Sequence, residues 1–382
     1  MIPGSRFTST WLRERLRESG EPVASEGAVD IEQIGQGRGL CSLIYRVGVD
    51  GRSYAIKITG LQQTPLSEAT EQEREYAAIV RSVHAREMQA YAWFNLLRDA
   101  DVAAATAPKL QRVPPTIARL YAAEEATEKY DGIIVMDDFS SKIETSLDWV
   151  KGYNEAQILS IIDQVVAFQF AGLAAAASPP YFPHNVRLRA VFGELTVGCI
   201  EKLPWLNERQ IKVMKECSEQ ASILATLGDT NGLEPVLIHC DFWPNNLLFQ
   251  KEANKVDLSV LAVLDWAAVS TGCCMVDVAS AIVLSLTPET RRAREDALLL
   301  AYVEGMRKRC DEGGITFDIT VELARALYTR CMRYSLLQMT MTAAFHPQFD
   351  QPEEGAQLGP LSQRLNALLE DIIADEDEHK RN

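Results

Sequence analysis

Positive charge and histidine are both scarce in this sequence. Its 382 residues include 38 Lys and Arg against 53 Asp and Glu, a formal net charge of −15, and 5 His. No basic surplus is present to release counterions from a polyanion, so we expect no nucleic-acid partner. No two His stand in H-x-x-x-H or H-x-H spacing, which disfavours a zinc-dependent hydrolase built on His239 and Asp241.

Long hydrophobic runs, paired cysteines and internal repeats are missing as well. Residues 1–6 have no apolar core of the kind found in signal peptides. The most apolar stretch, 158–177, is interrupted by polar residues such as Asp163 and Gln169, which favours a buried amphipathic helix over a membrane span. The 8 Cys form no C-x-x-C pair, so reduced buried thiols are expected. We therefore expect a cytoplasmic protein without a membrane span.

The pattern H-x-D-x-x-x-x-N is present between two apolar runs. The run 236–238 ends at His239, and a polar bend with Asp241 and Asn246 precedes the run 247–249. A further apolar run, 260–264, ends in Asp265. This layout is the core of kinase-type phosphoryl transfer, in which a carboxylate accepts the proton of a hydroxyl nucleophile. Asp241 fits that role, and Asn246 and Asp265 offer the hard oxygen ligands that Mg²⁺ prefers.

A glycine-rich bend precedes this pattern in the N-terminal part of the chain. Gly35, Gly37 and Gly39 lie between the predicted strands 29–34 and 42–49, and a third strand, 53–58, carries Lys57. Glycines let backbone N–H groups approach phosphate oxygens, and a strand-borne Lys can reach the α and β phosphates of ATP. A plain hairpin is the alternative for the glycines alone. A Walker loop is excluded, since no G-K-[ST] follows and a strand comes next.

A helix predicted over 67–98 carries a carboxylate on its apolar stripe. Glu87 recurs there with Val83 and Tyr91 at four-residue steps. Burying an unpaired carboxylate costs several kcal/mol, so Glu87 needs a cationic partner, and Lys57 is the natural candidate. Two alternatives to this pair remain. Glu87 lies only at the edge of the stripe, or Glu73 or Glu75 takes its place as the partner of Lys57.

The pattern of elements predicts an α+β protein with a two-lobed, protein-kinase-like fold. We expect an N-terminal helix and linker (1–27), a lobe with an antiparallel sheet and one helix (28–140), and a larger, mostly helical lobe (141–382). Further strands are predicted at 116–123 and 132–136. The helices of the second lobe are predicted at 155–177, 207–227, 276–286, 288–310, 320–345 and 361–375. Residues 181–205 are expected to be irregular, and the charged run 375–382 is expected to be a frayed end.

The loop and the strand that ends in Asp265 together resemble the motifs of a known superfamily. His239-x-Asp241-x-Trp243-x-Asn245-Asn246-Leu247-Leu248-Phe249, with Val263-Leu264-Asp265-Trp266, resembles the aminoglycoside phosphotransferase and choline kinase superfamily. Within it, the chain looks most like the ecdysteroid-kinase-like branch, also called choline-kinase-like (CHK), over roughly residues 28 to 345. Members of that branch carry an H-G-D-L-W-x-x-N-[IL]-L-[FW] loop and an [IL]-[IV]-D-[WFY] strand.

The resemblance implies a role for each matching residue. It makes Asp241 the catalytic base, Asn246 and Asp265 the Mg²⁺ ligands, and Lys57 with Glu87 the pair that orients the phosphates of ATP. Adenine would meet backbone groups of Asp137 and Phe139, behind Met136. Asp277 resembles the buried aspartate that braces the backbone of the catalytic loop, and His239 a structural anchor at the end of its strand.

Two positions depart from the pattern of the family. Cys240 replaces the usual Gly between His239 and Asp241, where packing is a simpler interpretation than a reactive thiol. Ala267 stands where protein kinases carry Gly, a change common in small-molecule kinases. Neither change removes a required group, so the resemblance implies an active enzyme that phosphorylates a hydroxyl group of a small molecule such as a sterol, glycoside or amino alcohol.

Two other functions fit parts of the sequence. In a protein Ser/Thr kinase, Thr287-Pro288-Glu289 would be the A-P-E motif, but the run 275–284 is too apolar for a phosphorylatable activation loop. A catalytically silent kinase fold that acts as a binding or regulatory module is the second alternative.

The acceptor is expected to bind to parts of 145–235 and 270–345, and the acidic balance favours a neutral or cationic alcohol. Six aromatic residues either line that pocket or pack in the core: Trp205, Trp243, Trp266, Tyr302, Tyr334 and Phe345.

Overall fold

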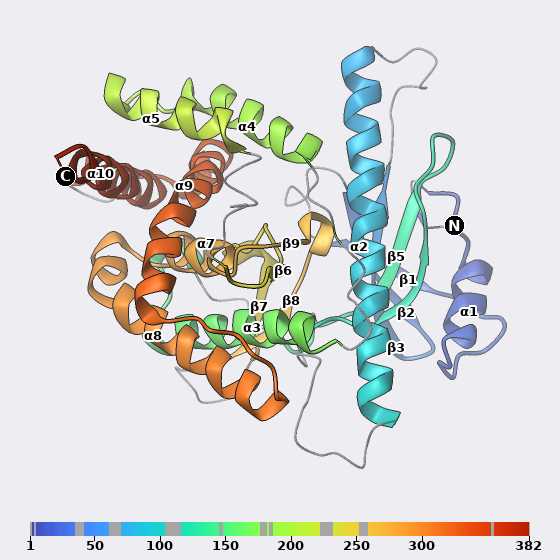
Figure 1. Ribbon diagram of the computed structural model, residues 1–382. Helices are drawn as coiled ribbons and strands as arrows, with labels where there is room; N and C mark the ends of the chain where they lie inside the picture. The colour runs from blue at the N-terminus through green and yellow to red at the C-terminus, as the bar shows by residue number, and fades with distance from the viewer. Residues whose placement is uncertain are drawn as a thin grey trace. The chain divides into compact units, whose positions relative to one another are not determined.

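A computed structural model describes residues 2–3, 5–34, 42–60, 70–103, 116–144, 148–175, 182, 186–221, 232–251, 259–352 and 355–381. The chain divides into two compact units (Figure 1). Unit 1 comprises Met1–Ala103, Ile117–Ile143 and Ala262–Ala268, and unit 2 comprises Ala104–Thr116, Glu144–Leu261 and Val269–Asn382. Residues 262–268, which carry Asp265, therefore group with the N-terminal part of the chain.

Unit 1 is built on a five-stranded antiparallel sheet in the order β1-β2-β3-β5-β4. The strands are β1 (Asp30–Ile34), β2 (Ser42–Val49), β3 (Arg52–Thr59), β4 (Leu120–Glu124) and β5 (Gly132–Asp137). The turn Asp50-Gly51 joins β2 to β3, with both residues at positive φ, as the hairpin signal predicts. The predicted strands are confirmed, except that β4 starts four residues later than the apolar run 116–123 suggests.

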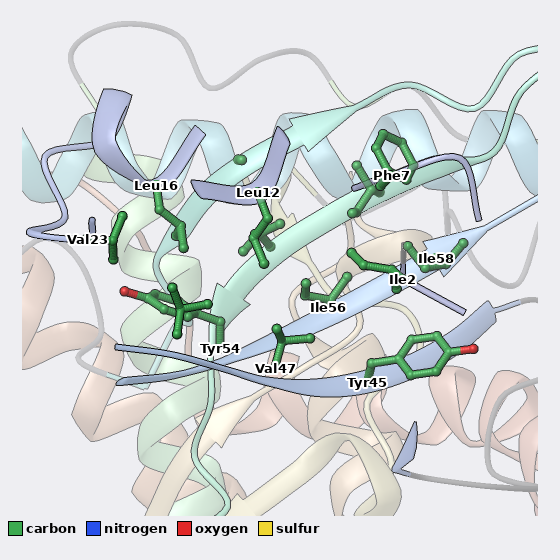
Figure 2. Packing of buried hydrophobic residues seen from close by; sticks show 14 residues of the cluster. Ile2, Phe7, Leu12, Leu16, Val23, Tyr45, Val47, Tyr54, Ile56 and Ile58 are labelled. Atoms are coloured by element: carbon green, nitrogen blue, oxygen red, sulfur yellow. The ribbon is translucent and has the colours of Figure 1, made fainter. Parts of the chain in front are cut away.

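The two faces of this sheet carry different helices, as Figure 1 shows. Alternate residues of a strand face opposite sides, so Tyr54, Ile56 and Ile58 of β3 point to one face and Lys57 to the other. The first face packs against α1 (Ser9–Glu18) in a buried cluster that includes Leu12 and Leu16 (Figure 2). The second face meets α2 (Glu71–Ala103). This alternation places Lys57 beneath α2.

Unit 2 is mostly helical. Its helices are α3 (Glu155–Ala174), α4 (Val186–Ile200), α5 (Glu208–Glu219), α7 (Met275–Ser285), α8 (Pro288–Gly313), α9 (Val321–Phe345) and α10 (Pro360–Arg381). Its short strands are β6 (Val236–Ile238), which pairs with β9 (Ser270–Gly272), and β7 (Leu247–Phe249). The partner of β7 is β8 (Val260–Val263), whose last two residues are grouped with unit 1. The α+β fold class is thus confirmed, and most of the predicted helices are present.

Helix α3 coincides with the most apolar stretch of the sequence. It is long and apolar enough to cross a membrane by length and composition, but 72% of its most apolar window is buried inside the protein. Its buried residues include Ile158, Ile162, Phe168 and Phe170. The stretch is therefore a core helix of unit 2, as its polar interruptions predict.

Two expectations for unit 2 are wrong. The segment predicted to be irregular contains α4, whose two glycines resemble helix breakers. A Cβ at Gly193 would lie 2.4 Å from the backbone oxygen of Ser218, so this glycine allows a close approach of the chain around α5. The charged tail is also not frayed, since α10 extends to Arg381. Three of its acidic side chains are in ion pairs: Asp375 and Glu376 with Arg333, at 3.2 and 3.6 Å, and Asp377 with Arg209.

The packing of α1 on the sheet gives a direct test of unit 1. Leu12 is fully buried, whereas Leu96, on α2 of the same unit, is 68% exposed. Leu12→Ala should lower the free energy of unfolding by about 2–5 kcal/mol, because it removes buried methyl groups and leaves a cavity. Leu96→Ala should change it by less than about 0.5 kcal/mol. Urea denaturation of both variants measures the difference, and equal effects would show that α1 does not pack as described.

Candidate active site

Lys57 is bound by two carboxylates in unit 1. Its Nζ lies 2.7 Å from Glu87 Oε2 and 3.1 Å from Asp265 Oδ1. Lys57 is 8% exposed and Glu87 1% exposed, so both charges are held away from water and need each other. The structure thus brings together three of the predicted site residues, from β3, from α2 and from the segment after β8.

Glu87, and not the alternatives on the same helix, is the partner of Lys57. Glu73 instead accepts hydrogen bonds from the backbone N–H and the hydroxyl of Thr70, at 2.7 and 2.8 Å. Burial raises the pKa of Glu87 to about 7, against the opposing effect of Lys57. Burial alone would lower the pKa of Lys57, but Asp265 and Glu87 together raise it above its ordinary value. The lysine is therefore a permanent cation in this site.

Asp265 is placed by its backbone and by its neighbour. Its φ is +61°, a left-handed conformation that turns the chain sharply at the end of β8. Trp266, the next residue, is fully buried and packs edge-to-face on Phe94 of α2, with ring centroids 4.8 Å apart. The same helix thus supplies Glu87 and fixes the segment that carries Asp265.

Two buried polar atoms near this cluster have no hydrogen-bond partner among the described residues: Glu87 Oε1 and Tyr91 Oη. Such atoms in a native structure call for a partner that the chain does not provide, such as water or a ligand. Together with the exposed part of Asp265, whose side chain is 40% accessible, they fit a site that binds a polar or metal-bearing molecule.

The catalytic loop of the sequence pattern lies in unit 2 and brings Asp241 and Asn246 together. It follows β6 and contains the 3-10 turn η2 (Pro244–Asn246). Asn246 Nδ2 donates to Asp241 Oδ2 at 3.0 Å and to the Asp241 carbonyl at 2.8 Å. Because the amide nitrogen is used in this way, the amide oxygen is the atom that Asn246 can offer to a cation. Asn246 therefore fits the chemistry of a Mg²⁺ ligand.

Asp277 holds the start of this loop. It is fully buried on α7, and its Oδ2 and Oδ1 accept the backbone N–H groups of His239 and Cys240 at 2.7 and 2.9 Å. The brace implied by the family resemblance is confirmed. Burial raises the pKa of Asp277 to about 7, although these two N–H groups lower it. His239 contributes as well, because its Nδ1 accepts the N–H of Asp241 at 3.2 Å.

The predicted adenine contacts lie at the end of β5 in unit 1. Met136 is buried in the sheet. The N–H of Asp137 donates to the Arg119 carbonyl, and the Phe139 carbonyl accepts from the N–H of Lys142. The Asp137 carbonyl and the Phe139 N–H are therefore the backbone groups that these two residues can offer to adenine.

Gly35, Gly37 and Gly39 lie outside the described residues, so their role stays a prediction.

The aromatic residues considered for the acceptor pocket separate by burial. Trp266, Tyr302 and Tyr334 are fully buried and belong to the core, whereas Phe345 is 37% exposed. Trp205 and Trp243 are half-buried.

Among the described residues, no cluster of three or more His, Cys, Asp or Glu is arranged to hold a metal ion.

One residue near the loop, Arg189, was not identified from the sequence as part of the site. Arg189 of α4 is 2% exposed and donates to the Tyr334 hydroxyl, which in turn donates to the Cys240 carbonyl at 2.7 Å. Arg189 falls in the segment expected to be irregular, and only its position in an otherwise apolar helix could have indicated a buried cation.

Comparisons with known proteins identify the family of this chain and proteins of similar sequence and fold. The DUF1679 family model, described as "Uncharacterized oxidoreductase dhs-27", matches residues 184–380, just over half of the chain. Two proteins of Caenorhabditis elegans are similar in sequence. "Uncharacterized oxidoreductase dhs-27" is 24% identical over 53% of this chain and 26% of its own length. "Uncharacterized kinase-like protein D1044.1" is 23% identical over 59% of this chain and 60% of its own length.

The chain thus spans about a quarter and about three-fifths of these two relatives, so the name of the first describes a protein that is mostly unmatched here. Among solved structures, the choline kinase of Cryptosporidium parvum Iowa II aligns with a TM-score of 0.50 and 11% identity, over 92% of this chain and 91% of that chain. The likeness shows the fold, and the predicted kinase-like fold is confirmed. The choice of the ecdysteroid-kinase-like branch stays a prediction.

The raised pKa of Asp277 predicts how stability depends on pH. Folding raises this pKa from about 3.8 to about 7, so the folded state binds the proton more tightly than the unfolded state does. The contribution of Asp277 to the free energy of unfolding is then complete below about pH 4 and is lost as the pH rises towards 7. Asn cannot titrate, so the stability of the wild type relative to Asp277→Asn should fall over this range.

Urea denaturation of both proteins at several pH values between about 4 and 8 measures this difference. Asp163→Asn is the control, because the Asp163 side chain is 60% exposed and should give a difference that varies little with pH. A wild-type advantage over Asp277→Asn that grows as the pH rises would contradict the assignment.

Proposed function

We propose that this chain, which belongs to the DUF1679 family, is a phosphotransferase that uses ATP and Mg²⁺ to phosphorylate a hydroxyl group of a small molecule. The observation that carries the proposal is the buried Lys57, bound at once by Glu87 and Asp265. A cation that is held in this way, beside a partly exposed carboxylate, is the arrangement that phosphate and metal binding need. The loop with Asp241 and Asn246 supplies the remaining parts.

Asp241 is proposed as the general base. In the reaction, the acceptor hydroxyl gives its proton to the Asp241 carboxylate while its oxygen bonds to the γ-phosphorus and the bond to the β-γ bridging oxygen breaks, releasing ADP. Asn246 donates to Oδ2 of Asp241 and so fixes the orientation of the carboxylate. Phosphoryl transfer requires little covalent chemistry from the protein, so this positioning supplies much of the rate.

Lys57 is proposed to neutralise charge on the phosphates of ATP. Glu87 holds the ammonium group in place, since a strand-borne Lys without a partner would sample several rotamers. Asp265 in unit 1 and the amide oxygen of Asn246 in unit 2 are the proposed Mg²⁺ ligands, each on the chemistry of its own side chain. Mg²⁺, when bound, would neutralise negative charge on the transferring phosphoryl group.

The acceptor is proposed to be a neutral or cationic alcohol, of the sterol, glycoside or amino-alcohol type. The net charge of −15 makes an anionic acceptor the less favourable choice.

The protein is proposed to act in the cytoplasm. The seven described cysteines are free and buried, which agrees with a reducing compartment.

A protein kinase activity is less well supported. The segment that would form its mobile activation loop contains α7, and every residue of this helix is buried. The Thr287-Pro288-Glu289 sequence begins α8, with Thr287 as its N-cap and Pro288 in its first turn. These residues therefore have a structural explanation.

The role of Asp241 is tested by its conversion to the neutral amide. A screen for ATP consumption with sterols, glycosides, choline-like amines and aminoglycosides first identifies an acceptor. With that acceptor, Asp241→Asn should lower kcat by about 10²–10⁴-fold, because the amide cannot accept the proton. Asp163→Asn is the matched control and should keep wild-type activity. Near-normal turnover of Asp241→Asn would overturn the assignment.

The role of Lys57 is tested by Lys57→Met, which keeps the aliphatic stem and removes the charge. We expect kcat/KM for ATP to fall by at least about 100-fold, since charge neutralisation on the phosphates is lost. Lys151→Met, at a side chain that is 75% exposed, should leave it unchanged. Thermal unfolding of each variant shows whether the fold is retained. A folded Lys57→Met protein with unchanged kinetics for ATP would refute the proposed role.

A further inference from the structure

The backbone of the catalytic loop takes an unusual turn at Cys240. Its φ is +65°, in the left-handed region that favours glycine, and its side chain is 1% exposed. A residue with a Cβ occupies this conformation only where its surroundings determine it. The direction of the next residue, Asp241, depends on this turn, so the groups that hold the two peptide units of Cys240 matter for the position of the base.

Both sides of Cys240 are held by buried side chains from different helices of unit 2. Its N–H donates to Asp277 Oδ1 of α7 at 2.9 Å. Its carbonyl accepts the Tyr334 hydroxyl at 2.7 Å and the Gln338 amide at 3.4 Å, both from α9. Tyr334 and Gln338 are four residues apart, one turn of the helix, so they approach the same oxygen from one face of α9.

The Tyr334 hydroxyl is itself oriented by a buried cation. Arg189 Nη1 of α4 donates to it at 2.5 Å, so the hydroxyl hydrogen is left to donate to the Cys240 carbonyl. The Tyr334 ring is also stacked against Phe192 of α4, with centroids 6.5 Å apart and planes 15° apart. Tyr334 is fully buried and Arg189 is 2% exposed. Burying a guanidinium group for packing alone is unfavourable. Orienting the hydroxyl of Tyr334 gives the buried guanidinium group of Arg189 a specific role.

We propose that Tyr334 and Arg189 are positioning residues for phosphoryl transfer, which hold the Cys240 carbonyl and thereby direct the carboxylate of Asp241. The kinetic part of this proposal rests on the proposed phosphotransferase activity. Neither residue need touch ATP or the acceptor. Asp277 holds the loop from the N–H side and Tyr334 from the carbonyl side, so the two act on opposite ends of one residue.

The test compares two tyrosines of the same helix. Tyr328 is also on α9, is 1% exposed, and uses its hydroxyl to donate to Glu295 Oε2 at 3.2 Å. Tyr334→Phe and Tyr328→Phe each remove one buried hydroxyl and keep the ring. If Tyr334 only stabilised the fold, the two variants would behave alike in every assay of the loop.

Hydrogen exchange of the backbone amides of 239–241 is the first readout. These amides should exchange at least about tenfold faster in Tyr334→Phe than in Tyr328→Phe, because only the first variant frees the loop. Equal exchange in the two variants would overturn the proposal. This readout requires no turnover, so it decides the proposal even if the wild type shows no phosphotransferase activity and the proposed function fails.

Steady-state kinetics is the second readout. Tyr334→Phe should lower kcat by about 10–100-fold, with KM for ATP nearly unchanged, since a misplaced base slows the chemical step. Tyr328→Phe should keep the wild-type kcat. Arg189→Lys, which keeps a cation but changes its geometry, should show a smaller loss than Arg189→Met. Loss of kcat in both tyrosine variants, or in neither, would contradict the assignment.

A double-mutant cycle with Cys240→Gly provides the last check. Glycine adopts the left-handed conformation without a Cβ penalty, so the turn should depend less on the Tyr334 hydroxyl in that background. The effect of Tyr334→Phe on kcat should therefore be at least about threefold smaller in Cys240→Gly than in the wild type. An equal effect in both backgrounds would show that Tyr334 does not act through the turn at Cys240.

Discussion

A single buried ammonium group, that of Lys57, governs the arrangement of unit 1. A cation at 8% exposure is tolerated only with carboxylates beside it, and the chain provides Glu87 and Asp265 within 3.1 Å. To bring these carboxylates to Lys57, β3 must present alternate residues to opposite faces, α2 must cross the second face, and the segment after β8 must turn sharply. The cost of burying charge therefore links a strand, a helix and a turn that are far apart in the sequence.

The backbone takes the same left-handed conformation at or next to two proposed site carboxylates, Asp241 and Asp265. Of the described residues other than Gly, three have positive φ, and two of them are Cys240 and Asp265. One precedes the proposed base and the other is a proposed metal ligand, and both follow a short strand. A left-handed residue at the end of a strand turns the chain abruptly, and buried neighbours hold it in place: Asp277 and Tyr334 in unit 2, Trp266 against Phe94 in unit 1.

The sequence predicts the parts of the site that depend on local patterns. Strand alternation around Lys57, the four-residue steps around Glu87, and the spacing of Asp241 and Asn246 each lead to contacts that are present. The supports of the loop are harder to foresee. Arg189 is absent from the sequence-based site because Gly193 and Gly198 resemble helix breakers, whereas Gly193 reflects close packing with α5 that only the tertiary structure reveals. The helix predicted at 361–375 is present, but the C-terminal end of α10 was expected to be frayed, since the ion pairs that hold it join residues distant in sequence.

Calorimetric titration of the protein with ATP, in the presence and absence of Mg²⁺, tests the central claim most directly. It requires no knowledge of the acceptor and reports on the site around Lys57 and Asp265. A phosphotransferase should bind one ATP with a dissociation constant at or below about 1 mM when Mg²⁺ is present, and more weakly without it. No saturable binding at several times that concentration, with Mg²⁺ and a folded protein, would contradict the account.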